Sequence, residues 1–282
     1  MLWLAAQAFG SRAHVLSVDH GLRAEASTEC ATVAERAASL GLPHSTLILD
    51  APPGPANVQA QARSARYAAM ADWCCSRGIG LLATAHHADD QAETLLLRLA
   101  RGSGIAGLAG IRPVQRLHGI AVVRPLLAWR RTDLAAALAP SGWVPADDPS
   151  NRDPRFDRAR MRALLGREPM LDPRRLAASA RYLADAEDAL AWATDRAWAS
   201  RAVAGDDAVL LDPESLPGEI QRRLLLRGLR AFGTAQPDGP DTARLLARLM
   251  AGGTGTLGGV KARALPDGRW RLSLAPPRKS RD

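Results

Sequence analysis

Strand-like and helix-like segments alternate through the first half of the chain, with short connections between them. Strands are predicted over HVLSVD (14–19), STLILD (45–50), IGLLATA (79–85) and GIAVVRPL (119–126). Helices are predicted over 26–41, 60–78, 86–102 and 131–142. The run IGLLATA is apolar throughout, so we expect it to be buried on both faces. This order predicts an α/β fold with a doubly wound, mostly parallel sheet, whose ligands lie outside the carboxyl ends of the strands.

The second half of the chain has a different character. Helices rich in Ala, Leu and Arg are predicted over 172–201, 218–233 and 241–251. The tail 256–277 is predicted to form two strands joined by the turn PDG. We therefore expect two domains: residues 1–165, and a mainly helical domain with a short β tail over residues 166–282.

The charge balance points to a polyanionic partner. The chain carries 37 Lys and Arg against 29 Asp and Glu, a formal net charge of +8. Nearly all of the cations are arginine, whose planar fork suits phosphate groups, so nucleic acid is the first partner to consider. Arginines on ordinary solvated surfaces would give the same excess of charge.

Cysteine usage and hydropathy indicate the compartment. Cys30, Cys74 and Cys75 form neither a disulfide framework nor a metal-binding spacing, which favours a reducing environment. No run reaches the ~18 apolar residues of a membrane span, and the opening residues lack the basic segment of a signal peptide. The sequence therefore predicts a cytoplasmic protein with no membrane partner.

The stretch HHADDQAET (86–94) is the sharpest candidate site. It follows a buried parallel strand, and His86, Asp90 and Glu93 have the spacing of one helix face. An imidazole beside two carboxylates could orient a base or hold Mg²⁺ on a polyphosphate. The alternative is a helix start whose acids are favourable near the helix dipole, which would account for Asp89 and Glu93 without any chemistry.

Three further stretches carry candidate binding residues. RGSGIAGLAG (101–110) follows a helix and not a strand, so it is either a phosphate-binding loop with Arg98, Arg101 and Arg112 nearby or a plain helix end. DDPSNRDPRFDRARMR (147–162) places Arg158 and Arg162 on one helical stripe that could bind a phosphate backbone. Its arginines could instead pair with Asp153 and Asp157. In VDHGLR (18–23), Asp19 and His20 could contact a nucleotide, or simply form a turn with Gly21.

Taken in order, VDHGLR, QAQARSARYAAM, TAHHADDQAETLLLRLARGSGIAGLAG, RPLL and DDPSNRDPRFDRARMR resemble the tRNA(Ile)-lysidine synthetases. These are PP-loop ATP pyrophosphatases of the adenine nucleotide α-hydrolase type. The resemblance covers residues 1–165 most closely, and it matches the rest more loosely as a tRNA-binding domain. It implies that ATP adenylates the C2 oxygen of cytidine 34 in the CAU anticodon of an isoleucine tRNA, and that L-lysine then displaces AMP.

The resemblance also implies roles for individual residues, with ATP and Mg²⁺ as cofactors and a homodimer as one assembly it allows. It places catalytic groups at His86, Asp90 and Glu93, nucleotide-binding groups at Asp19, His20, Gly21 and Arg101, and nucleic-acid contacts at Arg112, Arg158 and Arg162, with no residue assigned to a metal. Two alternatives stay open: a tRNA-binding relative without catalysis, and another PP-loop tRNA-modifying enzyme such as a thiolase, which would want catalytic or cluster-binding cysteines.

The chain departs from the family at its beginning. The family carries a Ser-Gly-Gly-x-Asp-Ser loop after its first strand, and this sequence contains no such loop. MLWLAAQAFG (1–10) resembles the later part of the helix that follows that loop and is closed by Gly10. We expect the first, central strand to be missing, which would leave two strand edges unpaired inside the sheet. A wrongly chosen start codon is the favoured explanation, and a truncated, inactive relative is the alternative.

Overall fold

The structure, a computed structural model, describes residues 1–19, 21, 25–49, 58–144, 153, 155–233 and 239–276. The chain divides into two compact units, Met1–Ala184 and Asp185–Asp282. The division falls inside helix α8 (Pro173–Arg201), whereas the sequence suggests a boundary at residues 165 and 166, inside α7 (Asp157–Arg167). Across the described residues, no helix combines the length and the apolar character needed to traverse a bilayer.

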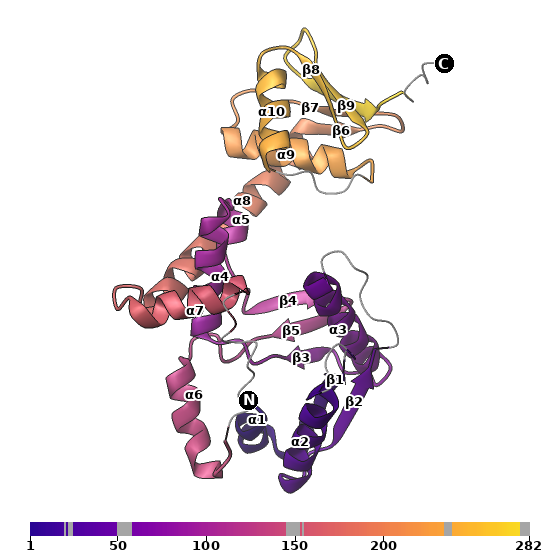
Figure 1. The fold of residues 1–282 in the computed structure, drawn as a ribbon. Helices are drawn as coiled ribbons and strands as arrows, with labels where there is room; N and C mark the ends of the chain where they lie inside the picture. The colour runs from indigo at the N-terminus through magenta and orange to yellow at the C-terminus, as the bar shows by residue number, and fades with distance from the viewer. Residues whose placement is uncertain are drawn as a thin grey trace. The chain divides into compact units, whose positions relative to one another are not determined.

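The strands of the first unit form two separate sheets (Figure 1). Strands β1 (Val15–Asp19) and β2 (His44–Ile48) pair in parallel. Strands β3 (Leu81–Ala83) and β5 (Ile120–Val123) also pair in parallel, and β4 (Val114–Leu117) joins β5 antiparallel. The helices that surround them are α1 (Leu2–Phe9), α2 (Glu25–Ser39), α3 (Val58–Cys75), α4 (Ala88–Ala100), α5 (Ile105–Leu108), α6 (Arg131–Leu138), α7 and the first part of α8. The mixed α/β fold with parallel strands confirms the expected fold class, while β4 and α5 were not foreseen.

Helix α3 packs against both sheets and forms much of the core of this unit. The buried cluster comprises Tyr67, Met70, Ala71, Cys74, Leu82, Ile120 and Val122, and Leu16, Val18 and Leu47 of the β1–β2 sheet pack against it. The α3 members recur at i, i+3, i+4 and i+7, which is one face of a helix. Since this single stripe touches strands of both sheets, α3 holds the two sheets together.

The two sheets are not joined by hydrogen bonds between β1 and β3. Within the described residues, β1 pairs only with β2, and β3 pairs only with β5, so one edge of each strand has no ladder partner. Two unpaired edges at these strands are what the sequence predicts. The expectation that the strand after residue 79 is buried on both faces is wrong: Leu82 is 9% exposed but Leu81 is 57% exposed. Successive side chains of a strand point to opposite faces, and α3 packs against only one of them.

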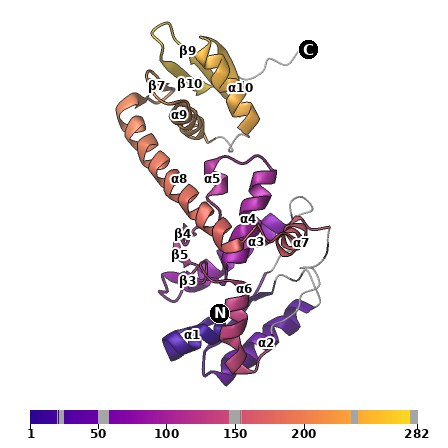
Figure 2. The ribbon, with the colours of Figure 1, turned by 90° about the vertical axis from the view of Figure 1, so that its left-hand side faces the viewer.

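An aromatic contact ties the beginning of the chain to the segment after α6. Helix α1 lies beside α6 (Figures 1 and 2) and ends at Gly10, whose φ of 53° suits glycine, as the sequence predicts. The rings of Trp3 and Trp143 meet edge to face with centroids 5.9 Å apart. The guanidinium of Arg36 lies 5.2 Å from the Trp143 ring and donates a hydrogen bond to the Val144 carbonyl at 3.0 Å.

The second unit is built around a five-stranded antiparallel sheet in the order β6-β7-β10-β9-β8. Its strands are β6 (Ala202–Ala204), β7 (Val209–Leu211), β8 (Thr254–Leu257), β9 (Val260–Ala264) and β10 (Trp270–Leu274), and its helices are the rest of α8, α9 (Gly218–Arg230) and α10 (Gly239–Met250). The tail therefore supplies three strands where the sequence suggested two. Its core gathers Leu224, Leu225 and Leu229 of α9, Leu245 and Leu249 of α10, and Val260, Ala262, Trp270 and Leu272 of the sheet.

We expect the second unit to depend on this core. Leu224 is fully buried, so Leu224→Ala removes transfer free energy and leaves a cavity, which costs about 2–5 kcal/mol of unfolding free energy in urea denaturation. Leu274→Ala, at a side chain that is 65% exposed in the same unit, is the matched control and should change stability by less than about 0.5 kcal/mol. Equal losses in the two variants would contradict the assigned core.

Candidate functional site

His86 lies in the connection between β3 and α4, at the carboxyl end of a parallel strand. Its Nδ1 shares a hydrogen bond of 2.9 Å with the Thr84 hydroxyl. Burial lowers the pKa of His86 from 6.5 to about 4; the Asp90 carboxylate opposes this change, and the charges of nearby arginines reinforce it. The imidazole is therefore neutral at physiological pH.

Three arginines from different elements lie close enough to His86 to lower its pKa. They are Arg63 of α3, Arg124, which directly follows β5, and Arg158 of α7. Arg98 of α4 joins them, because the charge of Arg158 also lowers the pKa of Arg98, after burial. We call Arg63, Arg98, Arg124 and Arg158 the arginine cluster. His86 and Arg124 follow the carboxyl ends of β3 and β5, the edge at which ligands of parallel sheets bind.

Arg124 is the most buried member of the cluster, with 4% exposure. Its guanidinium donates to the Arg112 carbonyl at 2.6 Å and to Gln115 Oε1 at 3.3 Å, while its buried Nε has no partner in the described part of the chain. A buried guanidinium normally lies beside a carboxylate, because an unpaired buried charge is costly. No carboxylate of the described residues pairs with any member of the cluster. The cluster is thus suited to an anion.

The glycine-rich segment 101–110 packs against α4. Arg98 donates to the carbonyls of Gly107 and Gly110, and Gln91 both accepts from the Ile111 N–H at 2.6 Å and donates to the Ile111 carbonyl at 3.1 Å. Gly110 has a φ of 68°, and a Cβ there would lie 2.5 Å from Gln91 Oε1, so only glycine fits. These contacts account for Gly110 through packing.

Asp89 and Asp90 have different partners at the start of α4. Asp90 accepts a hydrogen bond from the His87 N–H at 3.0 Å, and His87 Nδ1 accepts from the Asp90 N–H at 3.4 Å, a capping box. Asp89 accepts from the Arg131 N–H at 2.8 Å and pairs with Arg130, which ties α4 to the start of α6. Asp90 has no arginine partner among the described residues, so it is the acid that remains beside His86.

Glu93 and Arg162 form a buried ion pair between α4 and α7. The Glu93 side chain is 2% exposed, and Arg162 Nε donates to its Oε1 at 2.8 Å while Nη2 donates to Oε2 at 3.3 Å. The bond to Glu93 raises the pKa of Arg162. Because both carboxylate oxygens are engaged, this geometry gives the pair a role in joining α4 to α7. The catalytic role of Glu93 and the nucleic-acid contact of Arg162 stay predictions.

Several of the other arginines form ion pairs, as the alternative interpretation of residues 147–162 predicts. Arg155 pairs with Asp153, and Arg160 pairs with Asp157. Arg101, proposed as a nucleotide ligand, lies at the end of α4 and pairs with Asp157 at 2.6 Å.

The remaining proposed site residues lie apart or outside the described residues. Arg112 donates to the Ala184 carbonyl of α8 at 3.1 Å. Asp19 ends β1 and accepts from the Gly21 N–H at 2.9 Å, which is the turn expected there. His20 lies outside the described residues, as do Asp148, Ser150, Asn151 and Arg152.

Sequence reasoning missed Arg63 and Arg124, the two cluster members that α3 and β5 supply. Arg124 carries a usable signal, since it directly follows an apolar strand at the edge where ligands bind. Arg63 carries no such signal. Arg66 lies on the same helix and Arg77 just beyond its end, so a single arginine there does not stand out from a solvated face.

The described residues fit a polyphosphate better than they fit a metal ion on its own. The cluster offers four guanidinium groups that lack carboxylate partners and one orphaned Nε, a donor set matched to phosphate oxygens. No group of three His, Cys, Asp or Glu able to hold a metal occurs in the described part of the chain. A magnesium ion held by Asp90 would take its other ligands from phosphate and water, a usual arrangement for Mg²⁺.

Comparison with known proteins identifies the family. Residues 1–168 match the PP-loop domain family. The chain is 46% identical over 269 residues to a tRNA(Ile)-lysidine synthase of Novosphingobium aromaticivorans, covering 94% of this chain and 82% of the relative. It is 40% identical over 269 residues to that of Zymomonas mobilis, covering 94% and 81%. Among solved structures, a U34-tRNA thiolase from Methanococcus maripaludis matches with a TM-score of 0.49 at 12% identity, over 60% of this chain and 61% of that one, too weak a likeness to carry an argument.

Breaking the pair between α4 and α7 should destabilise the first unit. Arg162→Ala leaves the Glu93 carboxylate buried without its partner, which costs about 3–5 kcal/mol in urea denaturation. Arg155→Ala removes an exposed arginine of the same segment that pairs with Asp153, and it should leave the unfolding midpoint unchanged. An Arg162→Ala protein as stable as the parent would show that the pair is not structural.

The lowered pKa of His86 makes stability depend on pH. The folded-state pKa of about 4 lies below the ordinary 6.5. The contribution of the neutral His86 imidazole to folding stability is therefore complete above pH 6.5 and is lost as pH falls through 4. Between pH 7 and pH 4, we expect the unfolding free energy of His86→Asn to fall by about 2 kcal/mol less than that of the parent. This figure is discounted for solvent screening at the partly exposed ring. Urea midpoints at a series of pH values measure this difference. His14 and His44, whose pKa values burial also lowers, contribute equally to both proteins; identical pH profiles would contradict the assignment.

Proposed function

Because the chain belongs to the PP-loop family, and within it to the tRNA(Ile)-lysidine synthases, we propose that it joins L-lysine to cytidine 34 in the CAU anticodon of an isoleucine tRNA, using ATP. Family membership makes it a tRNA-modifying enzyme of the ligase type that uses ATP. Within the structure, the observation that supports the finer proposal most strongly is the arginine cluster around a neutral His86, with Asp90 beside it.

The arginine cluster would hold the phosphates at the carboxyl ends of β3 and β5. When bound, ATP would transfer its adenylyl group to the C2 oxygen of the cytidine and release pyrophosphate. The uncharged lysine ε-amine would then attack C2, and AMP would leave together with that oxygen. Arg124 and Arg158 would stabilise the negative charge that moves between phosphate oxygens. Arg124 is already held in place by the Arg112 carbonyl and Gln115. The buried Nε of Arg124 would gain its missing acceptor.

Asp90 and His86 would handle the incoming lysine. An ammonium group must lose a proton before it can attack, and a carboxylate beside a neutral imidazole attracts the ammonium without repelling it. Asp90 is held in place by the His87 N–H, and His86 by the Thr84 hydroxyl, so both side chains present a fixed geometry. We assign Asp90 to orient the amine and His86 to hydrogen-bond the cytidine or the amine in its uncharged form.

The rest of the proposal concerns organisation. We propose that residues 1–165 form the catalytic domain and that residues 166–282 contact the tRNA. A net charge of +8 for the whole chain is consistent with a nucleic-acid partner. The reaction would take place in the cytoplasm, where tRNA and lysine are present, with Mg²⁺ accompanying the phosphates. A homodimer is compatible with this scheme, although the chemistry assigned above uses residues of one chain.

Two other functions are compatible with family membership. A tRNA-binding relative without catalysis would need the basic surfaces but no adenylation. A thiolase-type enzyme would need a reactive cysteine, and here burial raises the pKa of the Cys30 and Cys74 thiols, which disfavours their reactive thiolate forms. The lysidine-forming activity is therefore the better supported of the three.

Lysine incorporation tests the proposal directly. The protein should attach radiolabelled lysine to an isoleucine tRNA with a CAU anticodon, only when ATP is present. Asp90→Asn keeps the hydrogen bond to the His87 N–H but removes the charge, so we expect a loss of at least 100-fold in kcat/KM. Arg158→Gln removes one phosphate contact and should cost about 100-fold.

Arg160→Gln is the matched control, because it removes an arginine of the same helix whose partner is Asp157 and not the cluster. It should retain the parent rate within about twofold. A parent protein that binds the tRNA but consumes no ATP would favour the binding-only alternative. Normal incorporation by Asp90→Asn and Arg158→Gln would remove both site assignments.

A further inference from the structure

One face of the five-stranded sheet of the second unit carries exposed cations. Along β9 the side chains of Val260 and Ala262 are buried in the core, so those of Lys261 and Arg263 lie on the opposite face and are exposed. In β10, Trp270 and Leu272 are buried in the same way, which places exposed Arg271 on that opposite face as well. We call Lys261, Arg263 and Arg271 the basic sheet face. Lys261 is one of only two lysines in the sequence.

The strand register aligns these cations with hydroxyl groups. Arg263 lies directly opposite Arg271 of β10 on one side and Thr254 of β8 on the other. The neighbouring row sets Lys261 between Ser273 of β10 and Thr256 of β8; Thr254 and Thr256 are exposed. Two short rows of cations and hydroxyls therefore run across β10, β9 and β8.

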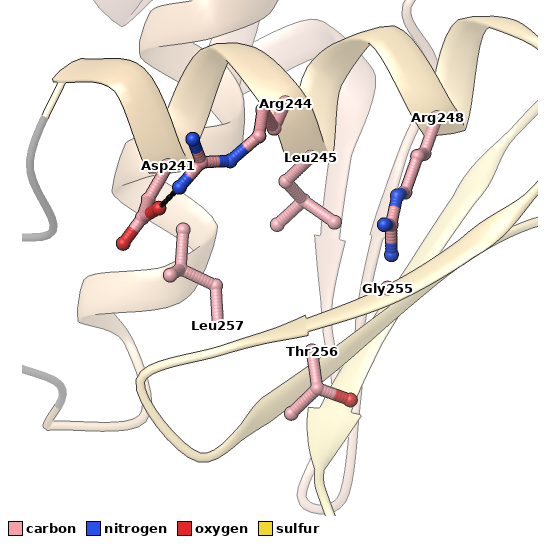
Figure 3. A pocket seen from close by; sticks show the side chains of 7 residues that line it. All are labelled: Asp241, Arg244, Leu245, Arg248, Gly255, Thr256 and Leu257. Carbon is pink, nitrogen blue, oxygen red and sulfur yellow. Dashed lines mark hydrogen bonds and ion pairs between the residues drawn. The ribbon is translucent and has the colours of Figure 1, made fainter.

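A close view of the β8 edge separates the two faces of the sheet. Figure 3 shows the Leu257 side chain directed toward α10, while the Thr256 side chain points away from that helix. On the α10 side, Arg244 pairs with Asp241, so that charge is already partly compensated. The basic sheet face lies on the other side, where Lys261, Arg263 and Arg271 line a hollow of about 230 Å³ together with Ser273.

The cations of the basic sheet face have no acidic partners within the part of the chain that the structure describes. No carboxylate of the described residues forms an ion pair with Lys261, Arg263 or Arg271, whereas Arg269 in the adjoining turn pairs with Asp267 at 2.6 Å. Like charges directly opposite each other in a sheet are destabilising, and Arg263 faces Arg271 in this way. A surface that keeps an unfavourable pair and leaves it uncompensated is typical of a binding site for a polyanion.

We propose that the basic sheet face binds the sugar–phosphate backbone of RNA, and that on the proposed function this RNA is the substrate tRNA. Arginine and lysine neutralise phosphates, and hydroxyl side chains donate to phosphate oxygens, so the two rows match a charged backbone and read no bases. An anionic membrane would favour aromatic anchors beside the cations. Here the neighbours within the rows are Thr254, Thr256 and Ser273, and the apolar residues that line the hollow, Leu265, Leu274 and Pro276, include no aromatic ring. The inference rests on the proposed function only for the identity of the RNA.

The salt dependence of RNA binding tests the basic sheet face. The measured quantity is the affinity of the full chain for a tRNA and for an unrelated RNA hairpin. It is measured at salt concentrations from about 50 to about 300 mM. A triple variant removes the three cations: Lys261→Gln, Arg263→Gln and Arg271→Gln. The magnitude of the slope of log K against log salt should fall by about 2 to 3 in this variant, equally for both RNAs. Arg269→Gln, which removes a compensated arginine of the same hairpin, should change the slope by less than about 1.

A second measurement separates this role from a structural one. Because removing the opposed charges relieves repulsion, the triple variant should unfold at the same temperature as the parent or above it. With saturating tRNA its kcat for lysine incorporation should be unchanged, while its KM for tRNA should rise at least fivefold.

The outcomes distinguish this inference from the proposed function. A reduced slope in a protein that incorporates no lysine supports the basic sheet face and refutes the proposed function. An unchanged slope and KM in a triple variant that is folded overturn the inference, whether or not lysine is incorporated. Equal weakening of both RNAs and of anionic phospholipid vesicles would show a non-specific charged surface and would also overturn it.

Discussion

The buried ion pair between Glu93 and Arg162 is the interaction on which the first unit most depends. Helix α4 buries the Glu93 carboxylate, and a buried carboxylate is costly without a cationic partner. Arg162 supplies that partner and so holds α7 against α4. Helix α7 also carries Arg158, four residues earlier on the same helix, toward His86. The pair thus helps to fix the helix that carries Arg158.

Charge compensation separates structural arginines from functional ones in this chain. Arg101, Arg155, Arg160 and Arg223 all have carboxylate partners. The pairs of Arg101 and Arg223 join different helices of their own unit, and those of Arg155 and Arg160 are local. The arginine cluster and the basic sheet face lack such partners among the described residues. Proteins tolerate uncompensated charge mainly where a ligand will supply the balance, so these two surfaces are where we propose that the excess positive charge of the sequence has a function.

The sequence predicts the fold well where a local pattern decides it. Strand–helix alternation located β1, β2, β3, α2, α3 and α4, since each needs only its own apolar periodicity and a closing glycine. The prediction that the strand is buried on both faces failed at Leu81, because the exposure of Leu81 depends on which face of β3 a helix covers. The HHADDQAET motif stays a prediction of the site, and the spacing of Glu93 could not reveal that its carboxylate pairs with Arg162, 69 residues later. Arg124 joins the site through sheet pairing of β3 with β5, which no local pattern records.

The central claim is that a neutral His86 and four arginines face one anion. The most direct test follows the His86 imidazole by NMR as pH is varied, with and without inorganic pyrophosphate. The account predicts a pKa of about 4 in the free protein, and a clear rise toward the ordinary 6.5 when the anion neutralises the surrounding arginines. A His86 pKa that does not move when pyrophosphate is present at saturating concentration would contradict it.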